Sequence, residues 1–579
     1  MVRIETASTD SLILYFAAQP SAQLSARIAQ ACEKIRGLTG ITDLIPAYTT
    51  VLLTFDLLQT DSASLRAQLE SLLEPLTEHW GSNPSETVSA GQQVLIPVYY
   101  HPEVAPDLEA LARAKGLTVD EVVQRHSQKS YRVAAIGFAP GFAYLGDVDE
   151  SIALPRHATP RLSVAKGSVA IAGTQTAVYP LESPGGWNII GRTPQAMIDR
   201  SLPELTPLAP GSSVRFEPIS REQFLALGGT LDENADAALD QKMQTDAAQV
   251  KNSDECSDLS SGLKTGFTVI HPGLMSQLQD AGRLGHQHVG LTTGGPLDEH
   301  AFLWANHLLK NPWDAAAVEI SFGGLKLQAQ VDTLIAVTGA DLAITVNDES
   351  AANWQVIPVR AGDRLEFGYP RSGTRAYLAV KGGFQVSPCF GSVATVQREQ
   401  MGGLTGEGQL LSFGDCLPCA EQEHRKDPQL QKLIGKRVSN NYLPDYTEPL
   451  VLRVIAGYQY DQFPAEQLER FFSEAYQILP DSDRMGVRLQ GPPIKALQAG
   501  ITSEGIALGA IQIPPDGQPI VLMRDRQTIG GYPKLGCVYP PDTGQLAQRH
   551  PNTKVRFELM PRHQAQQDLM RFYRYFRKA

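Results

Sequence analysis

The sequence predicts a mainly β fold with a small α+β domain at its amino end, and three observations support this prediction. From Tyr131 onward, short runs of β-forming residues are separated by glycine and proline, which is typical of barrels or sandwiches with functional loops. Before Tyr100 the sequence instead alternates strand-like and helical periodicities. Between Leu231 and Ser261 there are eight acidic residues, two lysines and no aromatic residue, which indicates a linker between two bodies.

The amino-terminal domain is predicted from the order of its elements, β-α-β-β-α-β. One apolar face, with Leu24 and Ile28, marks a helix over about Ser21–Arg36. The remaining elements are strands at Leu12–Ala17, Ile41–Ile45, Thr50–Phe55 and Gln93–Tyr100, and a second helix through Leu65, Leu69, Leu72 and Leu76. This order suits a two-layer α+β domain of ferredoxin-like type.

Two short helices follow, and the second opens with the capping box Thr118-x-x-Glu121. Later in the chain, the largest helical segment is expected over about Asp298–Lys310 and ends at Asn311-Pro312. We divide the chain into an α+β domain (1–90), a first barrel domain (91–228), an acidic linker (229–264), a second body with a barrel (265–565) and a basic tail (566–579).

A similar sequence pattern occurs in both halves of the chain. Lys166–Gln175 is a glycine-started β run that leads to Gly185-Gly186-Trp187, and Leu508–Gln518 leads in the same way to Gly530-Gly531-Tyr532. We interpret the halves as related barrels. The alternative is a chance likeness between two glycine-rich β sequences.

Bulk properties narrow the function. The 579 residues carry a formal net charge of −12, a poor match for nucleic acid, whose binding needs clustered Lys and Arg. No apolar run approaches the about 20 residues of a membrane span, and no signal peptide is recognisable, so a cytoplasmic chain is expected. The six cysteines are expected to be free thiols, and the pair Cys416-Leu-Pro-Cys419 is interpreted as a coincidence.

Familiar signatures are missing: there is no phosphate-binding P-loop, nucleophile elbow, H-E-x-x-H motif or dinucleotide fingerprint. What remains are loops rich in Gly, Pro and charged groups. Arginines there could hold a carboxylate or phosphate, and the acids could act as bases, although ion pairs that stabilise loops are the common alternative. His286-Gln-His288 has a metal-type spacing, but we interpret both histidines as surface or hydrogen-bonded groups and predict no metal ligand.

The first half resembles the B subunit of 5-oxoprolinase, whose family is also called the KipI or allophanate-hydrolase-subunit-1 family. The resemblance rests on IGFAPGFAYLG at 136–146, GSVAIAG at 167–173, YPLESPGGW at 179–187 and IGRTP at 190–194. The second half resembles the C subunit, whose family is called KipA or subunit-2, through QDAGRLG at 279–285, HVG at 288–290, GPLD at 295–298, SDRMG at 482–486, SEG at 503–505, PPDGQP at 514–519 and GGYP at 530–533.

The resemblance implies cyclophilin-like barrels in both halves and a fusion of two normally separate subunits. It also implies an ATP-dependent 5-oxoprolinase that opens 5-oxoproline to glutamate, with Mg²⁺ bound through ATP and with a separate A-type subunit as partner. There are departures: Ala165-Lys166 replaces the family's Pro-Ala, Gly294-Gly-Pro-Leu-Asp298 replaces Ser-Gly-Pro-Met-Asp, and Ala456-Gly-Tyr-Gln459 replaces Pro-Gly-Pro-Gln. These departures bear on substrate identity rather than on fold.

Two other functions stay open. One is carboxyl transfer or allophanate-type chemistry on urea or another amide, with biotin-dependent partners. The other is inhibition of a histidine kinase, as the KipI name implies. The oligomeric state also stays open: the tail at 566–579 is expected to be exposed, and a two-barrel body with such a tail could form a homodimer.

On the loops and the resemblance together, we predict catalytic roles for Asp298, Asp483, Arg484 and Glu504. Arginines are expected to bind the substrate carboxylate and the phosphorylated intermediate. Backbone N–H groups are expected to stabilise the oxyanion, and Asp298 or Asp483 to orient the water. The predicted substrate-binding positions are Gly137, Pro140, Arg161, Gln175, Gly185, Gly186, Arg192, Asp280, Arg283, His288, Gln512, Asp525, Gly530, Gly531 and Tyr532.

Overall fold

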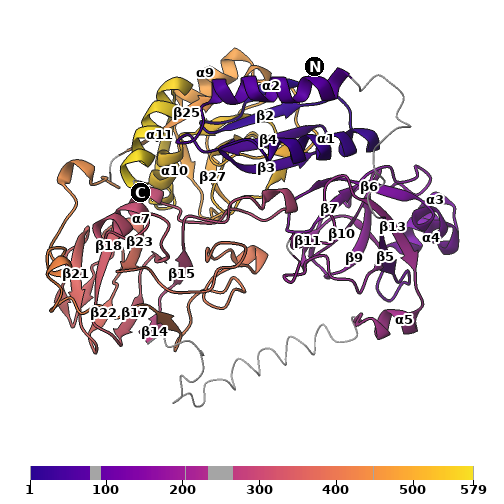
Figure 1. Ribbon diagram of the computed structural model, residues 1–579. Coiled ribbons are helices and arrows are strands. Elements are labelled where there is room, and N and C mark those ends of the chain that lie inside the picture. Colours follow the sequence, from indigo (N-terminus) through magenta and orange to yellow (C-terminus); the bar gives the residue numbers. More distant parts are fainter. Residues whose placement is uncertain (1, 79–92, 203, 232–264, 448, 578–579) are drawn as a thin grey trace.

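The structure is a computed structural model that describes residues 2–78, 93–202, 204–231, 265–447 and 449–577 (Figure 1). The predicted acidic linker falls almost entirely outside the described residues. The fold is mainly β, as the sequence predicts, with a few helices packed on the sheets. In the described part of the chain, no helix combines the length and the apolar character needed to cross a membrane.

The amino-terminal domain is a four-stranded antiparallel sheet in the order β1-β2-β4-β3, covered on one face by two helices. Alternation along β2 explains the two layers: Leu12 and Leu14 pack with the helices, and Ile13 points to the opposite face. The elements are β1 (Arg3–Thr6), β2 (Ser11–Tyr15), α1 (Ala22–Ile35), β3 (Ile41–Ala47), β4 (Thr50–Phe55) and α2 (Ser62–Glu78).

The ferredoxin-like topology is not confirmed for this domain. The strand predicted over Gln93–Tyr100 exists as β5 (Val94–Val98), but β5 pairs in parallel with β13 (Ser213–Pro218) of the first barrel. A hairpin partner at Arg3–Thr6, absent from the prediction, supplies the fourth strand instead. A strand without a partner of its own can complete any nearby sheet, and the sequence order alone could not select which sheet.

The two barrels share one strand order. In the first half it is β12-β9-β10-β7-β6-β13-β5, and in the second it is β32-β29-β30-β27-β26-β33-β25. At each position in the two orders the strands have the same rank along the chain. In both barrels the last two strands of the order, β13 with β5 and β33 with β25, form the parallel pair. The second barrel closes through β25 and β32, and the first through a single bridge between Tyr99 and Arg192. This match confirms that the halves are related.

The strands of the first barrel are β5, β6 (Ser130–Ile136), β7 (Ala143–Leu145), β9 (Ser168–Ala172), β10 (Gln175–Val178), β12 (Asn188–Arg192) and β13, beside a β8–β11 ribbon (Arg161–Val164, Ser183–Gly185). Those of the second are β25 (Leu450–Ala456), β26 (Tyr476–Ile478), β27 (Gly486–Gln490), β29 (Ala510–Gln512), β30 (Ile520–Leu522), β32 (Lys534–Val538) and β33 (Lys554–Leu559), beside a β28–β31 ribbon (Glu504–Gly505, Ile529–Gly530). Helices α3 (Leu108–Lys115), α4 (Val119–Ser127), α5 (Arg221–Ala226), α9 (Ala465–Ser473) and α10 (Pro540–Ala547) flank the barrels, and α4 has the predicted capping box.

A third body of two sheets precedes the second barrel and encloses its own apolar core. One sheet contains β20 (Glu349–Ser350), β19 (Thr345–Val346), β22 (Arg364–Glu366), β17 (Leu325–Ala329), β14 (Thr265–Pro272) and β24 (Cys416–Pro418); the other contains β15 (Met275–Gln279), β16 (Ala317–Ser321), β23 (Ser372–Val380), β18 (Thr333–Asp341) and β21 (Gln355–Val359). The predicted helix at Asp298–Lys310 is α7 (Glu299–Leu308), which packs on this second sheet.

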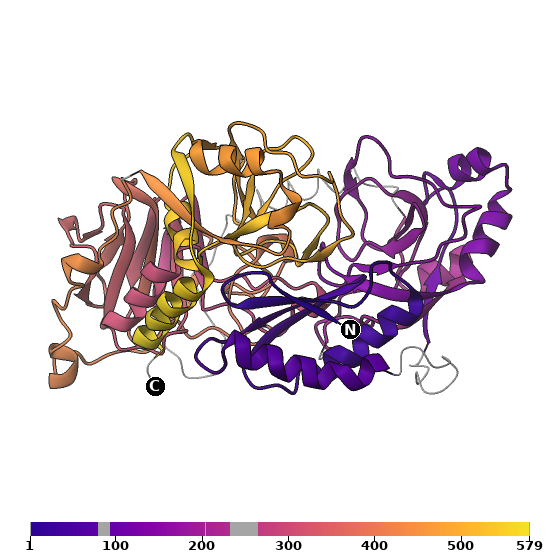
Figure 2. The same cartoon turned by 90° about the horizontal axis from the view of Figure 1, so that it is seen from above.

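The carboxy-terminal segment is a packed helix, so the prediction of an exposed tail is wrong. Helix α11 (Arg562–Phe576) buries Ala565 and Leu569, at i, i+4 spacing, in the core of the amino-terminal domain, and Phe576 beside α7. Figure 2 shows α11 lying between α7 and the amino-terminal domain. The last segment of the chain therefore joins its first domain to the second half.

Candidate functional site at the junction of the two halves

A pocket of about 340 Å³ lies where the two halves meet, and we call it the interdomain pocket. Its lining comes from the amino-terminal domain, from the first barrel, and from the loop before β28 of the second half. The lining residues are Pro20, Ser21, Ser25, Tyr48, Arg132, Ala134, Tyr144, Gly146, Asp147, Arg156, Thr174, Gln175, Ile501, Thr502 and Ser503. Its volume is within the range of small-molecule sites.

The polar lining suits an anion. Its charged lining residues are two arginines, Arg132 and Arg156, and one aspartate, Asp147. Arg132 Nη1 also donates to the carbonyl of Gly211 at 2.9 Å, which fixes its direction. Helix α1 begins at the pocket, where Ser21 caps it, so the positive end of the helix dipole adds to the same field. A small carboxylate or phosphate is the ligand class that this arrangement favours.

Gln175 is the predicted substrate-binding residue that lies in this pocket. Its Nε2 donates to the hydroxyl of Tyr48 at 2.8 Å, and the rings of Tyr48 and Tyr144 lie 6.1 Å apart. Burial raises the pKa of both phenols, so they stay neutral hydroxyl groups at ordinary pH. The amide and the two hydroxyls can therefore donate or accept hydrogen bonds without adding charge.

Directly after the pocket residue Ser503 in the chain, Glu504 is the centre of a buried polar network. Lys534 Nζ lies 2.7 Å from Glu504 Oε1, and both side chains are 5% exposed. The hydroxyl of Tyr458 donates to the same oxygen at 2.5 Å, and the hydroxyl of Tyr15 donates to Oε2 at 2.9 Å. Tyr15 belongs to the amino-terminal domain and the other three to the second half. The network therefore crosses the junction between the amino-terminal domain and the second half.

Three further predicted residues surround this network. Gln512 faces Lys534 across the β29–β32 pair, and its Nε2 is buried without a hydrogen-bond partner among the described residues. Gly530 pairs with Glu504, and a Cβ placed on it would lie 2.9 Å from that Nε2. The carbonyl of Gly531 accepts from the N–H of Ile501 at 2.9 Å, which holds the pocket loop against the ribbon.

Arg484 and Asp525 belong to a second buried network. Arg484 donates to Asp525 from Nε and Nη2, at 2.9 and 3.0 Å, and to Glu319 Oε1 at 2.5 Å. Its Nη2 also donates to the carbonyl of Gly295 at 2.7 Å. Burial alone would lower the pKa of Arg484, but the charges of Asp525 and Glu319 outweigh burial and raise it. This network clamps the two-sheet body to the second barrel.

The two predicted aspartates serve local structure. Asp298 is fully buried and caps α7, where it accepts from the N–H of Ala301 at 3.1 Å and from Tyr446 and Gln548. Asp483 lies in an exposed turn and accepts from the N–H groups of Met485 and Gly486. Neither aspartate lines the interdomain pocket.

The remaining charged residues that were predicted to bind substrate have hydrogen-bond or ion-pair partners within the protein. Each is held by a nearby group: Arg161 by Asp107 (2.6 Å), Arg192 by the carbonyl of Thr230 (3.2 Å), Asp280 by Ser392 (2.5 Å), Arg283 by the carbonyl of Cys389 (3.0 Å) and His288 by Glu204 (2.8 Å). Burial lowers the pKa of His288, and no group of three or more metal-ligating side chains occurs in the described ranges.

The cysteines agree with the prediction of thiols as far as the structure describes them. Cys416 and Cys419 are both thiols rather than one disulfide, and so are the other described cysteines. Cys256 lies outside the described residues.

The predicted residue Gly137 and its neighbours mark a close approach of the two halves. A Cβ on Gly137 would lie 2.5 Å from Ile529 in the β28–β31 ribbon, and the N–H of Gly141 donates to the carbonyl of Val289. Pro140 lies at the same contact, against Gly290. Of the others, Gly185 packs on the ring of Tyr179, Gly186 lies over Pro160, and Tyr532 is 41% exposed.

Sequence reasoning missed six residues of this site: Tyr15, Tyr48, Arg132, Arg156, Tyr458 and Lys534. Lys534 directly follows the Gly530–Pro533 motif, a signal that could have marked it. The others lie on ordinary strands and loops, and only the docking of the halves brings them together.

Comparison with known proteins shows where the chain belongs. Two family models match it: "Carboxyltransferase domain, subdomain C and D" over residues 2–208, and "Carboxyltransferase domain, subdomain A and B" over residues 289–559. The C subunit of 5-oxoprolinase from Escherichia coli K12 is 34% identical over 309 residues, which cover 53% of this chain and 96% of that protein. The B subunit of 5-oxoprolinase from Bacillus subtilis 168 is 33% identical over 229 residues, 39% of this chain and 95% of that protein.

The crystal structure of the protein TTHA0988 superposes on nearly the whole chain. Its TM-score is 0.77 at 30% identity, and the match covers 96% of this chain and 100% of that one. The fold, the junction between the two halves and the order of the two family matches all agree with a B-like part followed by a C-like part. The chain belongs to the carboxyltransferase-domain family of 5-oxoprolinase subunits B and C, with the B-like and C-like parts joined in one polypeptide.

Proposed function

We propose that the chain is the B and C component of an ATP-dependent 5-oxoprolinase, which converts 5-oxoproline to glutamate together with an A-type subunit. The observation that carries the proposal is the interdomain pocket, a small cationic site that is assembled from both halves. Relatives of both halves have 5-oxoprolinase names, so a site between the halves is where a shared substrate belongs.

The substrate sets the chemical demands. 5-Oxoproline has a carboxylate and an unstrained lactam, and opening the lactam is uphill without coupling. ATP, bound with Mg²⁺, would transfer a phosphoryl group to the lactam oxygen, which activates the carbonyl, and would leave as ADP. Water then adds to the carbonyl carbon, the C–N bond breaks, nitrogen leaves as the amine, and a second water releases phosphate to give glutamate.

The residues of the pocket fit these demands. Arg156 and Arg132 bind the substrate carboxylate, with the amino end of α1 behind them. Tyr48 and Gln175 offer neutral hydrogen bonds to the lactam. Glu504 and Lys534 act as positioning residues, because their network binds Tyr15 of the amino-terminal domain and directly follows the pocket loop Ile501–Ser503 in the chain.

The test is glutamate release from 5-oxoproline with ATP and Mg²⁺, measured for this chain alone and with a co-expressed A-type subunit. Glutamate only in the combined sample is the expected result. Absence of glutamate from both samples contradicts the proposal. That result would favour carboxyl transfer, because both matching family models are described as carboxyltransferase domains. Capture of biotinylated partners by the chain would then test that alternative.

A further inference from the structure

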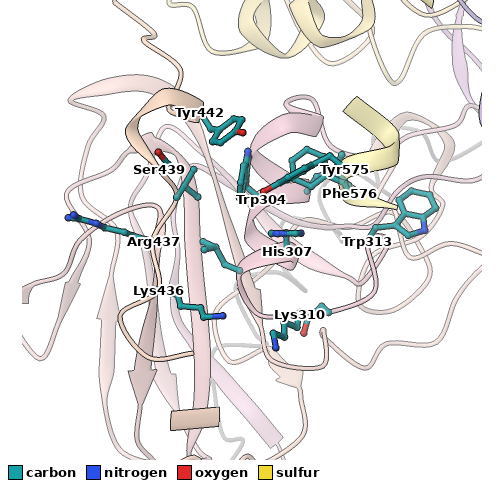
Figure 3. A pocket seen from close by; sticks show the side chains of 14 residues that line it. Trp304, His307, Lys310, Trp313, Lys436, Arg437, Ser439, Tyr442, Tyr575 and Phe576 are labelled. Atoms are coloured by element: carbon teal, nitrogen blue, oxygen red, sulfur yellow. The ribbon is translucent and has the colours of Figure 1, made fainter. Parts of the chain in front are cut away.

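A larger cavity, of about 740 Å³, lies away from the junction of the halves and shares no lining residue with the interdomain pocket. Three segments form it: α7 with the turn after it, residues 436–442, and the end of α11. We call it the aromatic cavity (Figure 3). The proposed reaction assigns it no role.

One side of the cavity is built from aromatic rings. The ring centroid of Trp304 lies 5.5 Å from that of Tyr442 and 5.4 Å from that of Tyr575. Trp304 is anchored, because its Nε1 donates to His300 at 3.1 Å. Tyr442 and Tyr575 are 52% and 37% exposed, so each leaves ring surface open to a ligand. A flat group can stack there without displacing the core.

The other side is cationic. Lys310, Lys436 and Arg437 line the cavity, and none of its described lining residues is an aspartate or glutamate. In Figure 3, Lys310 and Lys436 lie below His307, and Tyr442, Trp304 and Tyr575 lie above it. Lys381 adds to this charge: its Nζ donates to the carbonyl of Lys310, and burial and the charge of Lys310 lower the pKa of Lys381. Such a cluster in a chain of net charge −12 favours an anion at this place.

We propose that the aromatic cavity binds a small anion that carries an aromatic ring, of the class of a purine mononucleotide. The ring stacks on the open faces of Tyr442 and Tyr575, and the anionic group binds Lys310 and Lys436. Each feature selects one part of the ligand: an uncharged ring lacks the ion contacts, and a free anion lacks the stacking. The cavity is large enough for both parts together.

The test is calorimetric titration of the full chain with AMP, and separately with adenosine and inorganic phosphate. The variant is Lys310→Gln/Lys436→Gln, which removes two charges and keeps the rings. The matched control is Lys495→Gln/Lys554→Gln, which removes two exposed charges elsewhere. We expect AMP to bind the wild type and the control alike, and the variant at least about tenfold more weakly, as for lost charge-assisted contacts.

Adenosine and phosphate should each bind the wild type more weakly than AMP. Equal AMP affinity of the Lys310→Gln/Lys436→Gln variant and the wild type would overturn the proposal, and so would absence of AMP binding to the wild type at millimolar concentration. A nucleotide bound in the interdomain pocket instead would leave the variant unchanged, so that result also counts against the aromatic cavity.

Discussion

Two buried carboxylates of this protein, Glu319 and Glu504, belong to hydrogen-bond networks of similar composition that connect different parts of the chain. Glu319 pairs with Arg484 and accepts from Tyr377, and Glu504 pairs with Lys534 and accepts from Tyr15. In each network, a cation neutralises a carboxylate that burial would otherwise penalise. Burial and charge alone therefore do not separate a structural network from one at a functional site.

The difference lies in which parts of the chain each network joins. The partners of Glu319 belong to the second half, and Arg484 uses its donors on Asp525, Glu319 and Gly295. The Glu504 network reaches into the amino-terminal domain through Tyr15, and beside it Gln512 Nε2 has no partner among the described residues. We infer that the first network stabilises the second half and that the second shapes the site at the junction.

The largest expected effect is on stability, from Arg484→Met. The substitution removes the cation that is paired with both buried carboxylates, Glu319 and Asp525, which should lower the free energy of unfolding by about 3–5 kcal/mol. Urea unfolding followed by circular dichroism measures this change. Arg488→Gln is the control, because its pair with Asp481 is exposed and should contribute no more than about 1 kcal/mol. Equal midpoints for the two variants would contradict the structural role of Arg484.

The next prediction compares matched phenols. Tyr15→Phe and Tyr377→Phe each remove one O–H donor from a buried carboxylate, at 2.9 and 2.8 Å, and each should cost about 1–3 kcal/mol of stability. Only Tyr15→Phe should lower kcat of the assembled enzyme, by about tenfold, which corresponds to about 1.4 kcal/mol. Steady-state glutamate release, measured at a temperature where both variants are folded, gives kcat.

In this pair, Tyr377→Phe is the control for Tyr15→Phe. It loses the hydrogen bond to Glu319 and the one that its hydroxyl accepts from the N–H of Asp298, both outside the Glu504 network, and it should keep the wild-type kcat. A tenfold fall of kcat in Tyr377→Phe, with no fall in Tyr15→Phe, would reverse the assignment of the two networks.

The fold was predictable where a pattern repeats along the chain. The glycine-rich echo at Lys166–Gln175 and Leu508–Gln518 predicted related barrels, and the shared strand order confirms it. The fate of the strand at Val94–Val98 was not predictable, because its partner β13 lies over a hundred residues later. The packing of α11 was missed because its many basic residues obscure a narrow apolar stripe with Ala565 and Leu569.

The site was predictable only in part. Gln175 and Glu504 stood in motifs. The structure places Gln175 in the pocket and Glu504 in the buried network that directly follows the pocket residue Ser503. Arg132 and Arg156 carry no local signal, since an arginine on a strand or loop looks the same whether or not a second domain covers it. Gly137 was predicted as a substrate-binding position, and in the structure its near neighbour is Ile529 of the other half. Where catalysis and interface both need glycine, the sequence alone does not separate them.

The most direct test of the central claim is the KM for 5-oxoproline of Arg156→Gln, in the enzyme assembled with an A-type subunit. Arg156 lines the interdomain pocket, and its Cζ lies over the ring of Trp187, 5.6 Å from the ring centroid. Loss of its charge should raise KM by about tenfold or more and leave kcat nearly unchanged, because the substrate carboxylate does not change during the reaction. Arg488→Gln, which removes an exposed charge elsewhere, should keep the wild-type KM. An unchanged KM in Arg156→Gln would contradict the placement of the substrate between the two halves.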